Sequence, residues 1–211
     1  MRWSRRVIWM VLLACCGAAG AQTAAIFNSK VQTLPAKELQ AALRGGGNVI
    51  YFRHAATVVG ADQNTTDFDD CSTQRNLSDE GRADARAVGV AFERLSIRVG
   101  DVLASPYCRT MDTARLAFGR ATRSMELFSR GAAKLPDELA RVEWLRAAFG
   151  KAPPAGLNTV LVSHGSPLEA VTGEFMREGE CVVARPTGDG GFRLIARLTP
   201  AQWTELAALS P

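Results

Sequence analysis

The sequence has little of several features that mark other protein classes. Its 211 residues contain no internal repeat, which excludes a solenoid. Charged residues make up 22% against 47% hydrophobic ones, which excludes an intrinsically disordered chain. The spacing of its five cysteines matches no zinc-binding pattern. What remains is a chain with the length and composition of one globular domain.

The hydrophobic run near the N-terminus is too short to cross a bilayer as a helix, which needs ~20 residues. Residues 1–6 are basic, residues 7–16 are apolar, and Ala19-Gly20-Ala21 is a small-residue cleavage motif. This layout is typical of a secretory signal peptide. We therefore expect cleavage after residues 1–21 and a periplasmic or secreted protein.

Two other interpretations of this N-terminal segment stay open. Residues 12–15 are similar to a lipoprotein cleavage site, in which Cys15 would carry a lipid anchor. Alternatively, the apolar run is retained as an uncleaved anchor.

Removal of residues 1–21 also removes the excess of positive charge. The segment holds three arginines and no acidic residue, which leaves 22 of the 25 basic residues against 21 acidic ones. The mature chain therefore has a net charge near zero, and this charge gives no reason to expect nucleic acid as a partner.

Short apolar runs alternate with amphipathic segments along the rest of the chain. We expect strands at 48–52, 101–104, 121–127 and 158–162, and a C-terminal hairpin from 181–185 and 191–198. We expect helices at 35–44, 78–95, 107–118 and 137–149, and another after 163–167. This alternation predicts an α/β three-layer sandwich, a mostly parallel sheet flanked by helices. We divide the chain into the signal peptide (1–21), an N-terminal segment with a helix (22–47) and a catalytic domain (48–211).

The two histidines of the sequence each follow an apolar strand directly. His54 follows the first expected strand and His164 the fourth, and Ser105-Pro106 ends the second. In parallel sheets, ligands bind outside the carboxyl ends of the strands. The three positions are therefore expected to lie close together.

These residues supply what transfer of a phosphoryl group needs. Arg53 and Arg109 offer planar guanidiniums that can each hold two phosphate oxygens. His54 offers a neutral imidazole as nucleophile, and a protonated His164 would add a donor. The helix that starts near Ser166 offers backbone N–H groups to an anion. Two histidines beside arginines, without a carboxylate at ligand spacing, make a poor cation site, so we expect no metal and no cofactor.

Four blocks of the sequence resemble the histidine phosphatase (phosphoglycerate mutase-like) superfamily. Residues 53–57 (Arg-His-Ala-Ala-Thr) resemble its R-H-G-x-T signature, with Ala55 in the usual glycine position, and residues 76–81 resemble its L-[ST]-x-x-G segment. Residues 105–114 match its S-P-x-x-R-x-x-x-T-A block, and residues 160–165 match its second histidine strand. The blocks stand in the family's order and span roughly residues 48–170.

The resemblance implies a phosphoglycerate mutase-like fold and a role for each matching residue. His54 would become phosphohistidine, Arg53 and Arg109 would clamp the phosphate, and His164 would donate to it. Thr57 would shape the loop and touch the phosphate. Water would then hydrolyse the intermediate without a metal. Ala55 fits in place of glycine if its φ is negative.

The general acid is the least defined member of the expected site. One branch of the family places an aspartate directly after the second histidine, where this chain has Gly165. The other branch takes a glutamate from the segment after the third strand, which makes Glu126 the first candidate. Glu169 is the second candidate and Asp70 the third.

Three cysteines lie beyond the signal peptide. Cys71 and Cys108 each flank a motif of the expected site, and an oxidising compartment permits a disulfide, so we expect these two to pair. In the alternative, Cys71, Cys108 and Cys181 are all reduced and packed as small hydrophobic residues.

Together these features predict an exported phosphohydrolase that acts on phosphate monoesters, either a phosphoprotein or a phosphorylated sugar of the cell envelope. Two alternatives stay open: a phosphomutase on the same core, and a phosphate-binding module without catalysis. The sequence does not decide whether Ser72, Arg75 and Asn76 contact the substrate beyond its phosphate.

Overall fold

The computed structural model describes residues 31–63, 67–129 and 136–209. The expected signal peptide and Cys15 lie outside these ranges. Within them, every helix is too short or too polar to cross a bilayer.

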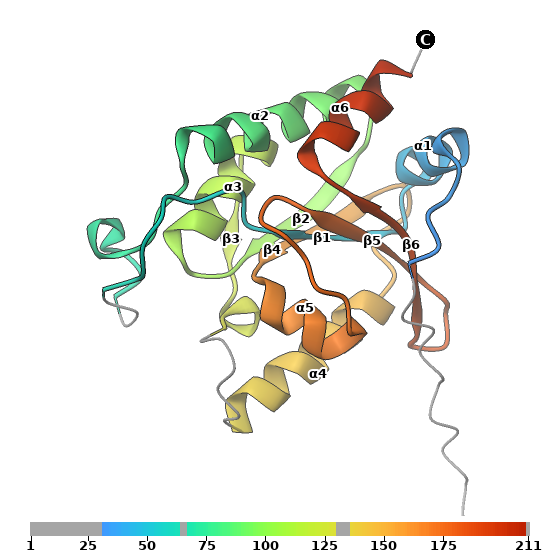
Figure 1. The fold of residues 1–211 in the computed structure, drawn as a ribbon. Coiled ribbons are helices and arrows are strands. Elements are labelled where there is room, and N and C mark those ends of the chain that lie inside the picture. The colour runs from blue at the N-terminus through green and yellow to red at the C-terminus, as the bar shows by residue number, and fades with distance from the viewer. Residues whose placement is uncertain (1–30, 64–66, 130–135, 210–211) are drawn as a thin grey trace, which may run out of the picture.

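A six-stranded sheet forms the centre of the molecule (Figure 1). Its order is β3-β2-β4-β1-β5-β6; the first four strands in this order run parallel, and β5 runs antiparallel to both of its neighbours, β1 and β6. The strands are β1 (Val49–Arg53), β2 (Val99–Ala104), β3 (Thr122–Arg123), β4 (Asn158–Ser163), β5 (Cys181–Pro186) and β6 (Phe192–Leu198). The predicted hairpin is the pair β5–β6, and the predicted fold class is confirmed.

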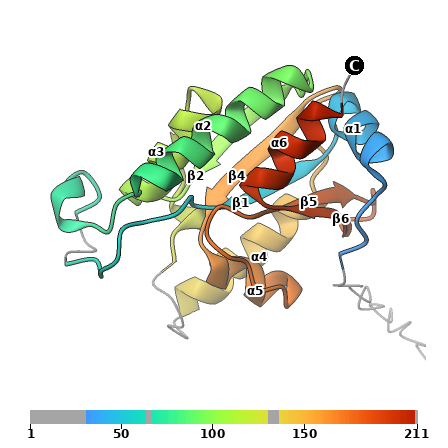
Figure 2. The same ribbon diagram turned by 45° about the horizontal axis from the view of Figure 1, so that its top comes forward.

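Helices cover both faces of this sheet, as Figures 1 and 2 show. One face carries α1 (Ala36–Gly45), α2 (Asp79–Arg94), α3 (Cys108–Phe118) and α6 (Pro200–Ala208). The other carries α4 (Pro136–Gly150) and α5 (Gly165–Thr172). The molecule is thus a three-layer sandwich with one hydrophobic core on each side of the sheet.

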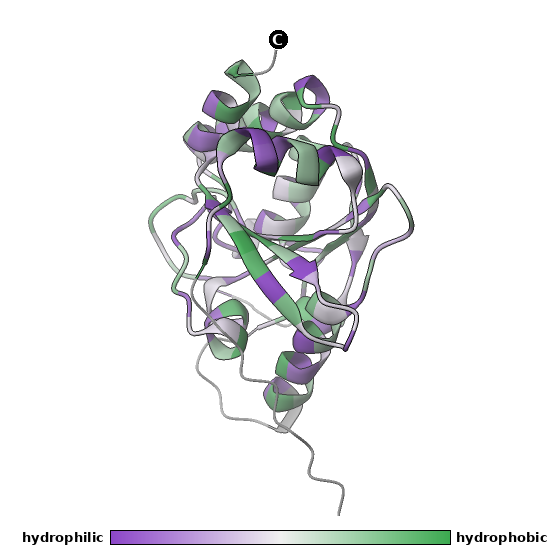
Figure 3. Cartoon of the chain, turned by 90° about the vertical axis from the view of Figure 1, so that its right-hand side faces the viewer, coloured by the Kyte–Doolittle hydropathy of each residue, from purple (hydrophilic) through white to green (hydrophobic). Residues whose placement is uncertain are grey.

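The two-residue period of β1 explains how one strand serves both cores. Ile50 and Phe52 pack on the side of α2 and α6, whereas Val49 and Tyr51 pack on the side of α4 and α5. A strand buried on both faces reads as a continuous apolar run, which is why it was evident in the sequence. In Figure 3 the helices around the sheet mix green and purple, as expected of elements that bury one face against a core.

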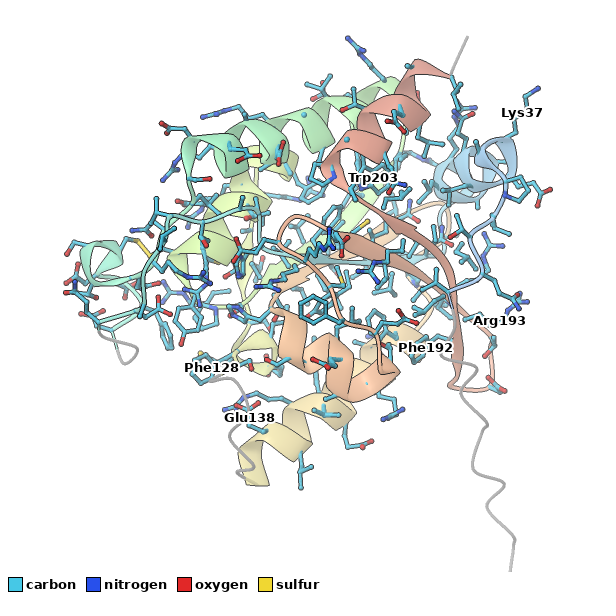
Figure 4. All side chains as sticks on the ribbon, in the orientation of Figure 1. Lys37, Phe128, Glu138, Phe192, Arg193 and Trp203 are labelled. Carbon is cyan, nitrogen blue, oxygen red and sulfur yellow. A yellow bond between two sulfur atoms is a disulfide. The ribbon has the colours of Figure 1, made fainter. Side chains whose placement is uncertain are left out.

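Helix α6 was not expected from the sequence. Trp203, labelled in Figure 4, lies between this helix and the sheet, with its ring 6.2 Å from that of Phe52. The start of the helix carries a capping box: Thr199 and Gln202 exchange side-chain-to-backbone hydrogen bonds, with Pro200 in the first turn. This capping pattern in the sequence could have predicted the start of α6.

The strand expected at 121–127 is only two residues long. After β3, the chain forms the short 3-10 turn η2 (Met125–Leu127), which buries Leu127 in the core beside α4 and α5. The side chain of Glu126 is turned to solvent as a result.

The loop after β1 is closed at its base by contacts with the start of α2. Ser78 caps α2 through its side chain, and its backbone N–H donates to the carbonyl oxygen of Ala56 at 3.0 Å. Thr57 and Leu77 form an antiparallel bridge directly beyond this contact. A methyl group on Gly81 would overlap the Ala56 carbonyl, so this close approach requires glycine. The segment that follows His54 is therefore fixed by α2.

Candidate active site

The two histidines lie side by side at the carboxyl ends of adjacent strands. Arg53 pairs with Ser163 in the β1–β4 register, so the residues that follow them, His54 and His164, are neighbours. Their ring centroids are 5.6 Å apart. Only 2% of His54 and 7% of His164 are exposed.

Two arginines beside these rings have donors without a partner. Arg53 ends β1, and Arg109 lies in the first turn of α3. Among the described residues, no acceptor bonds the buried Nε of either side chain. A buried donor without a partner costs roughly 1–3 kcal/mol.

A cavity of about 650 Å³ opens over this group. Its lining includes the guanidinium and imidazole side chains of Arg53, His54, Arg75, Arg109 and His164. Ser166 and Glu169 of α5 also line it. The structure thus gathers in one place the four residues expected to hold and attack phosphate, together with the helix start at Ser166.

His54 has the protonation state of a nucleophile. Its Nδ1 donates to the carbonyl oxygen of Ala55 at 2.9 Å, which leaves the lone pair on Nε2. Burial lowers the pKa of the ring to about 4, opposed in part by that hydrogen bond. The φ of Ala55 is not positive. An alanine therefore fits the position where the family signature has glycine.

The low pKa of His54 predicts that the folded state loses stability in mild acid. The unfolded chain takes up a proton near the ordinary pKa of 6.5, whereas the folded protein resists protonation until about pH 4. The stabilisation is therefore complete above about pH 6.5 and falls by up to roughly 1.4 kcal/mol per unit as the pH drops below it. Urea unfolding between pH 7 and 5, where few carboxylates titrate, measures the slope. A His54→Asn variant should show a shallower slope, and an equal slope would contradict this assignment.

His164 is held by hydrogen bonds with two neighbours. Its Nε2 is 2.9 Å from the hydroxyl of Ser105, and its carbonyl oxygen accepts a 2.7 Å hydrogen bond from the hydroxyl of Tyr51. Burial lowers the pKa of the ring well below its ordinary value, and His54 and Arg109 lower it further. His164 is therefore neutral in this environment, whereas the sequence analysis expected a protonated donor. The negative charge of a phosphate would raise this pKa again.

A carboxylate that the sequence analysis missed organises the arginine side of the cavity. Glu178 lies 3.4 Å from Arg53 and 3.3 Å from Arg75. It also accepts hydrogen bonds from the backbone N–H and the hydroxyl of Thr57, at 3.0 and 3.1 Å. Thr57, expected to touch phosphate, is thus bound to Glu178. Glu178 follows α5 in a segment without a recognisable motif.

Asp62 is the second carboxylate that was missed. It accepts a hydrogen bond from the Arg109 guanidinium at 2.8 Å and one from the backbone N–H of Arg75, also at 2.8 Å. Asp62 lines the cavity. It stands in a loop with several aspartates, and nothing in their spacing distinguishes it from the others.

Of the three residues whose contact with substrate was left open, Arg75 lines the cavity. Ser72 donates to Asp70, and the side chain of Asn76 donates to the carbonyl oxygen of Cys71. Ser72 and Asn76 therefore serve the fold of the loop.

The three candidates for the general acid are separated by the structure. Glu126, the first choice, does not line the cavity: it is exposed on η2, where a hydrogen bond from Ser124 lowers the pKa of its carboxyl. Asp70 caps the short 3-10 turn η1 (Cys71–Thr73) by accepting from the backbone of Ser72. Glu169 alone of the three lines the cavity.

A disulfide joins Cys71 to Cys108, the pair expected from the sequence, with the Cα atoms 5.7 Å apart (yellow bond at the left of Figure 4). Cys108 directly precedes Arg109, and its backbone N–H donates to the side chain of Gln74. The bond therefore ties the loop that carries Asp62 to the start of α3. Cys181 is reduced and buried.

Reduction of this disulfide is expected to lower the free energy of unfolding by roughly 2–4 kcal/mol, because the bond closes a loop with a sequence separation of 37 residues. Urea unfolding with and without a dithiol reductant measures the difference. A double variant, Cys71→Ser with Cys108→Ser, is the control, since reductant should leave its stability unchanged. Equal stability of reduced and oxidised wild type would show that the bond does not constrain the chain.

No metal site is evident in the part of the chain that the structure describes, where no three or more His, Cys, Asp or Glu side chains cluster in a way that could hold an ion.

Comparisons with known proteins found one matching family model and several solved structures with a similar fold. The model of the histidine phosphatase superfamily (branch 1) matches residues 49–130. No curated protein sequence matches the chain. Among solved structures, the protein histidine phosphatase SixA in complex with tungstate is 16% identical with a TM-score of 0.53, covering 74% of this chain and 98% of its own.

Two mycobacterial structures are similar to the same extent. The product of an open reading frame of Mycobacterium tuberculosis is 18% identical with a TM-score of 0.54, covering 73% of this chain and 98% of its own. A mycobacterial glucosyl-3-phosphoglycerate phosphatase is also 18% identical, with a TM-score of 0.51, covering 71% of this chain and 97% of its own. At these identities the likeness shows the shared fold.

Proposed function

We propose that this chain is a member of the histidine phosphatase superfamily, whose model matches residues 49–130, and that it hydrolyses phosphate monoesters through a phosphohistidine on His54. The observation that carries the proposal is the pair of buried imidazoles, 5.6 Å apart, that lines one cavity together with the guanidinium groups of Arg53 and Arg109. These groups match the charge and the hydrogen-bonding capacity of a phosphate.

The reaction follows from the protonation state of each group. Nε2 of His54 attacks phosphorus, the P–N bond forms, and the P–O bond to the leaving group breaks. Arg53 and Arg109 stabilise the negative charge on the phosphoryl oxygens, and His164 donates to one of them. Water then attacks the phosphohistidine, which releases phosphate and restores His54.

We assign the proton for the leaving oxygen to Glu169. This glutamate lines the same cavity as His54 and lies on α5, one turn beyond Ser166. Its carboxylic acid protonates the leaving oxygen in the first step and recovers a proton from the attacking water in the second.

The proposed chemistry predicts a substrate-dependent effect of Glu169→Gln. Alkyl phosphates, whose leaving groups need a proton, should be hydrolysed roughly 100-fold more slowly. An aryl phosphate with a good leaving group should lose much less. The variant Glu143→Gln, on the exposed side of α4, is the control and should match wild type with both substrates. If the variant loses the same factor in rate with both substrates, Glu169 is not the general acid.

Turnover of a generic aryl phosphate by the purified protein tests the function itself. A phosphate-binding module without catalysis would bind inorganic phosphate but release none from this substrate. A phosphomutase would transfer the phosphoryl group to a second site of its substrate instead of to water. The alternative of binding alone is favoured only if binding is observed and release is absent.

We propose further that the protein is exported. The basic, apolar and small-residue layout of residues 1–21 supports this, as does the Cys71–Cys108 bond, since disulfides persist in oxidising compartments. N-terminal sequencing of protein recovered from a periplasmic fraction should begin at Gln22. Recovery of the intact chain from the cytosol would contradict export.

A further inference from the structure

The segment between α5 and β5 is bonded to the end of β1 through backbone atoms. The N–H of Gly179 donates to the carbonyl oxygen of His54 at 2.8 Å, and the N–H of Arg53 donates to the carbonyl oxygen of Glu180 at 3.0 Å. Neither bond involves a side chain, so the segment keeps its place when one of its side chains is changed. Glu178 directly precedes these two positions and is therefore held next to Arg53.

This segment contacts the guanidinium of Arg53 at two points. Nη1 donates to the carbonyl oxygen of Met176 at 2.7 Å, and Nη2 lies 3.4 Å from a carboxylate oxygen of Glu178. Among the described residues, Glu178 is the one carboxylate that forms an ion pair with Arg53. A planar group held at one point can still rotate about it, whereas two points fix its direction. The orientation of Arg53 therefore depends on Glu178.

The same carboxylate also joins two other parts of the site. It lies 3.3 Å from Nη1 of Arg75, which reaches the cavity from the loop after η1. It accepts hydrogen bonds from the backbone N–H and the hydroxyl of Thr57, at 3.0 and 3.1 Å. One side chain thus holds two arginines of the cavity and the segment that follows His54.

Glu178 carries a charge and stands behind the cavity. Burial tends to raise the pKa of its carboxyl, but the neighbouring His54, Thr57 and Arg75 lower it below the ordinary value on balance. Arg53 and Arg75 are both part of the cavity lining, and Glu178 is not. The carboxylate therefore acts on a bound phosphate through the guanidiniums.

From these contacts we infer that Glu178 is a positioning residue, whose carboxylate holds the guanidinium of Arg53 toward the phosphoryl group while His54 attacks. The inference rests on the proposed phosphatase function and adds to it a residue that no motif indicates. A free arginine side chain must give up rotamer freedom to meet the charge of the transition state. A carboxylate that immobilises the side chain beforehand removes this cost from the chemical step.

Two other roles fit Glu178 less well. A proton donor needs a protonated carboxyl that faces the leaving oxygen, but the oxygens of Glu178 accept from Thr57 and face two guanidiniums. A purely structural bond would add little, because the backbone bonds of Gly179 and Glu180 already hold the segment.

The test is the variant Glu178→Gln, which keeps the shape of the side chain and an acceptor for Thr57 but removes the charge. With an aryl phosphate, kcat should fall roughly 10- to 100-fold, the effect of a misplaced group at a reacting centre. The inhibition constant for inorganic phosphate should rise by no more than about threefold, because both guanidiniums remain and a negative charge beside them is gone.

Glu174→Gln is the matched control. Glu174 lies in the same segment, and its side chain is 25% exposed, against 24% for Glu178. It pairs with Arg197 at 3.6 Å and does not line the cavity. This variant should keep the wild-type kcat.

A double-mutant cycle shows whether Glu178 acts through Arg53. In an Arg53→Ala background, Glu178→Gln should lower kcat further by less than about threefold, because the group that it positions is absent. Thr57→Val gives a second route, since it removes a donor to Glu178 without changing a charge. It should lower kcat by about threefold in wild type and have no effect in the Arg53→Ala background.

The outcomes separate this inference from the function on which it rests. If wild type releases no phosphate from the aryl substrate, the phosphatase proposal fails and the role of Glu178 fails with it. If wild type is active and Glu178→Gln keeps its kcat, only the positioning role is wrong. The same holds if the loss is as large in the Arg53→Ala background, or if the inhibition constant for phosphate rises by the factor that kcat loses. Thermal melts check that each variant is folded, and Thr57→Val carries the test if Glu178→Gln is not.

Discussion

Replacing His54 with alanine is expected to lower phosphate release by roughly 10⁴-fold or more, because no other group can take the place of the nucleophile. His54 is one of only two histidines in the sequence, and the other, His164, has its Nε2 at hydrogen-bond distance from Ser105. The measurement is kcat/KM with an aryl phosphate, together with a thermal melt that compares the folded state of variant and wild type.

Trapping of the intermediate gives the same prediction a direct readout. Wild type quenched during turnover of a ³²P-labelled substrate should carry an acid-labile label on His54, and His54→Ala should carry none. The variant should still bind inorganic phosphate, because Arg53 and Arg109 remain. A variant that keeps the wild-type kcat would eliminate His54 as the nucleophile.

Replacing Arg109 with alanine is expected to lower kcat/KM by roughly 100- to 1,000-fold, the usual effect of removing one donor to charge that develops in the transition state. The guanidinium is well placed for this role: only 6% of Arg109 is exposed, it lies 4.2 Å from the centre of the Tyr107 ring, and Asp62 holds it at 2.8 Å. Its loss would also leave the carboxylate of Asp62 without this partner and close to the phosphate.

The control for this variant lies on the same helix. Arg115 is more than half exposed, and its one ion pair among the described residues is with Asp112 at 3.9 Å, so Arg115→Ala should change kcat/KM by less than twofold. Arg109→Lys should recover only part of the activity, because an ammonium keeps the charge but not the planar fork. Full activity of Arg109→Lys would mean that charge alone is needed at this position.

The residues that the sequence placed correctly share one physical property: their positions follow from the ends of regular elements. His54 and His164 follow strands buried on both faces, and such strands stand out as apolar runs. Parallel pairing then puts their ends at one edge of the sheet. The same reasoning gave the order of strands and helices up to β6, and the cap of α2 at Ser78.

The residues that were missed or misplaced depend on how irregular segments fold. Glu178 and Asp62 reach the arginines from loops, and no periodicity indicates where a loop directs its side chains. Glu126 does not reach the cavity, because the next residue, Leu127, is buried in the core and the chain forms the turn η2 at this point. Helix α6 was overlooked although its capping box could be read from the sequence.

The contact between α2 and the segment after His54 has a consequence for how this fold can diversify. Because the Ala56 carbonyl and the Thr57–Leu77 bridge close the base of the loop, its ends are fixed independently of its length. Each doubling of a loop's length costs only about 0.6 kcal/mol in chain entropy. Insertions between these two anchors could therefore reshape the rim of the cavity while His54 keeps its place.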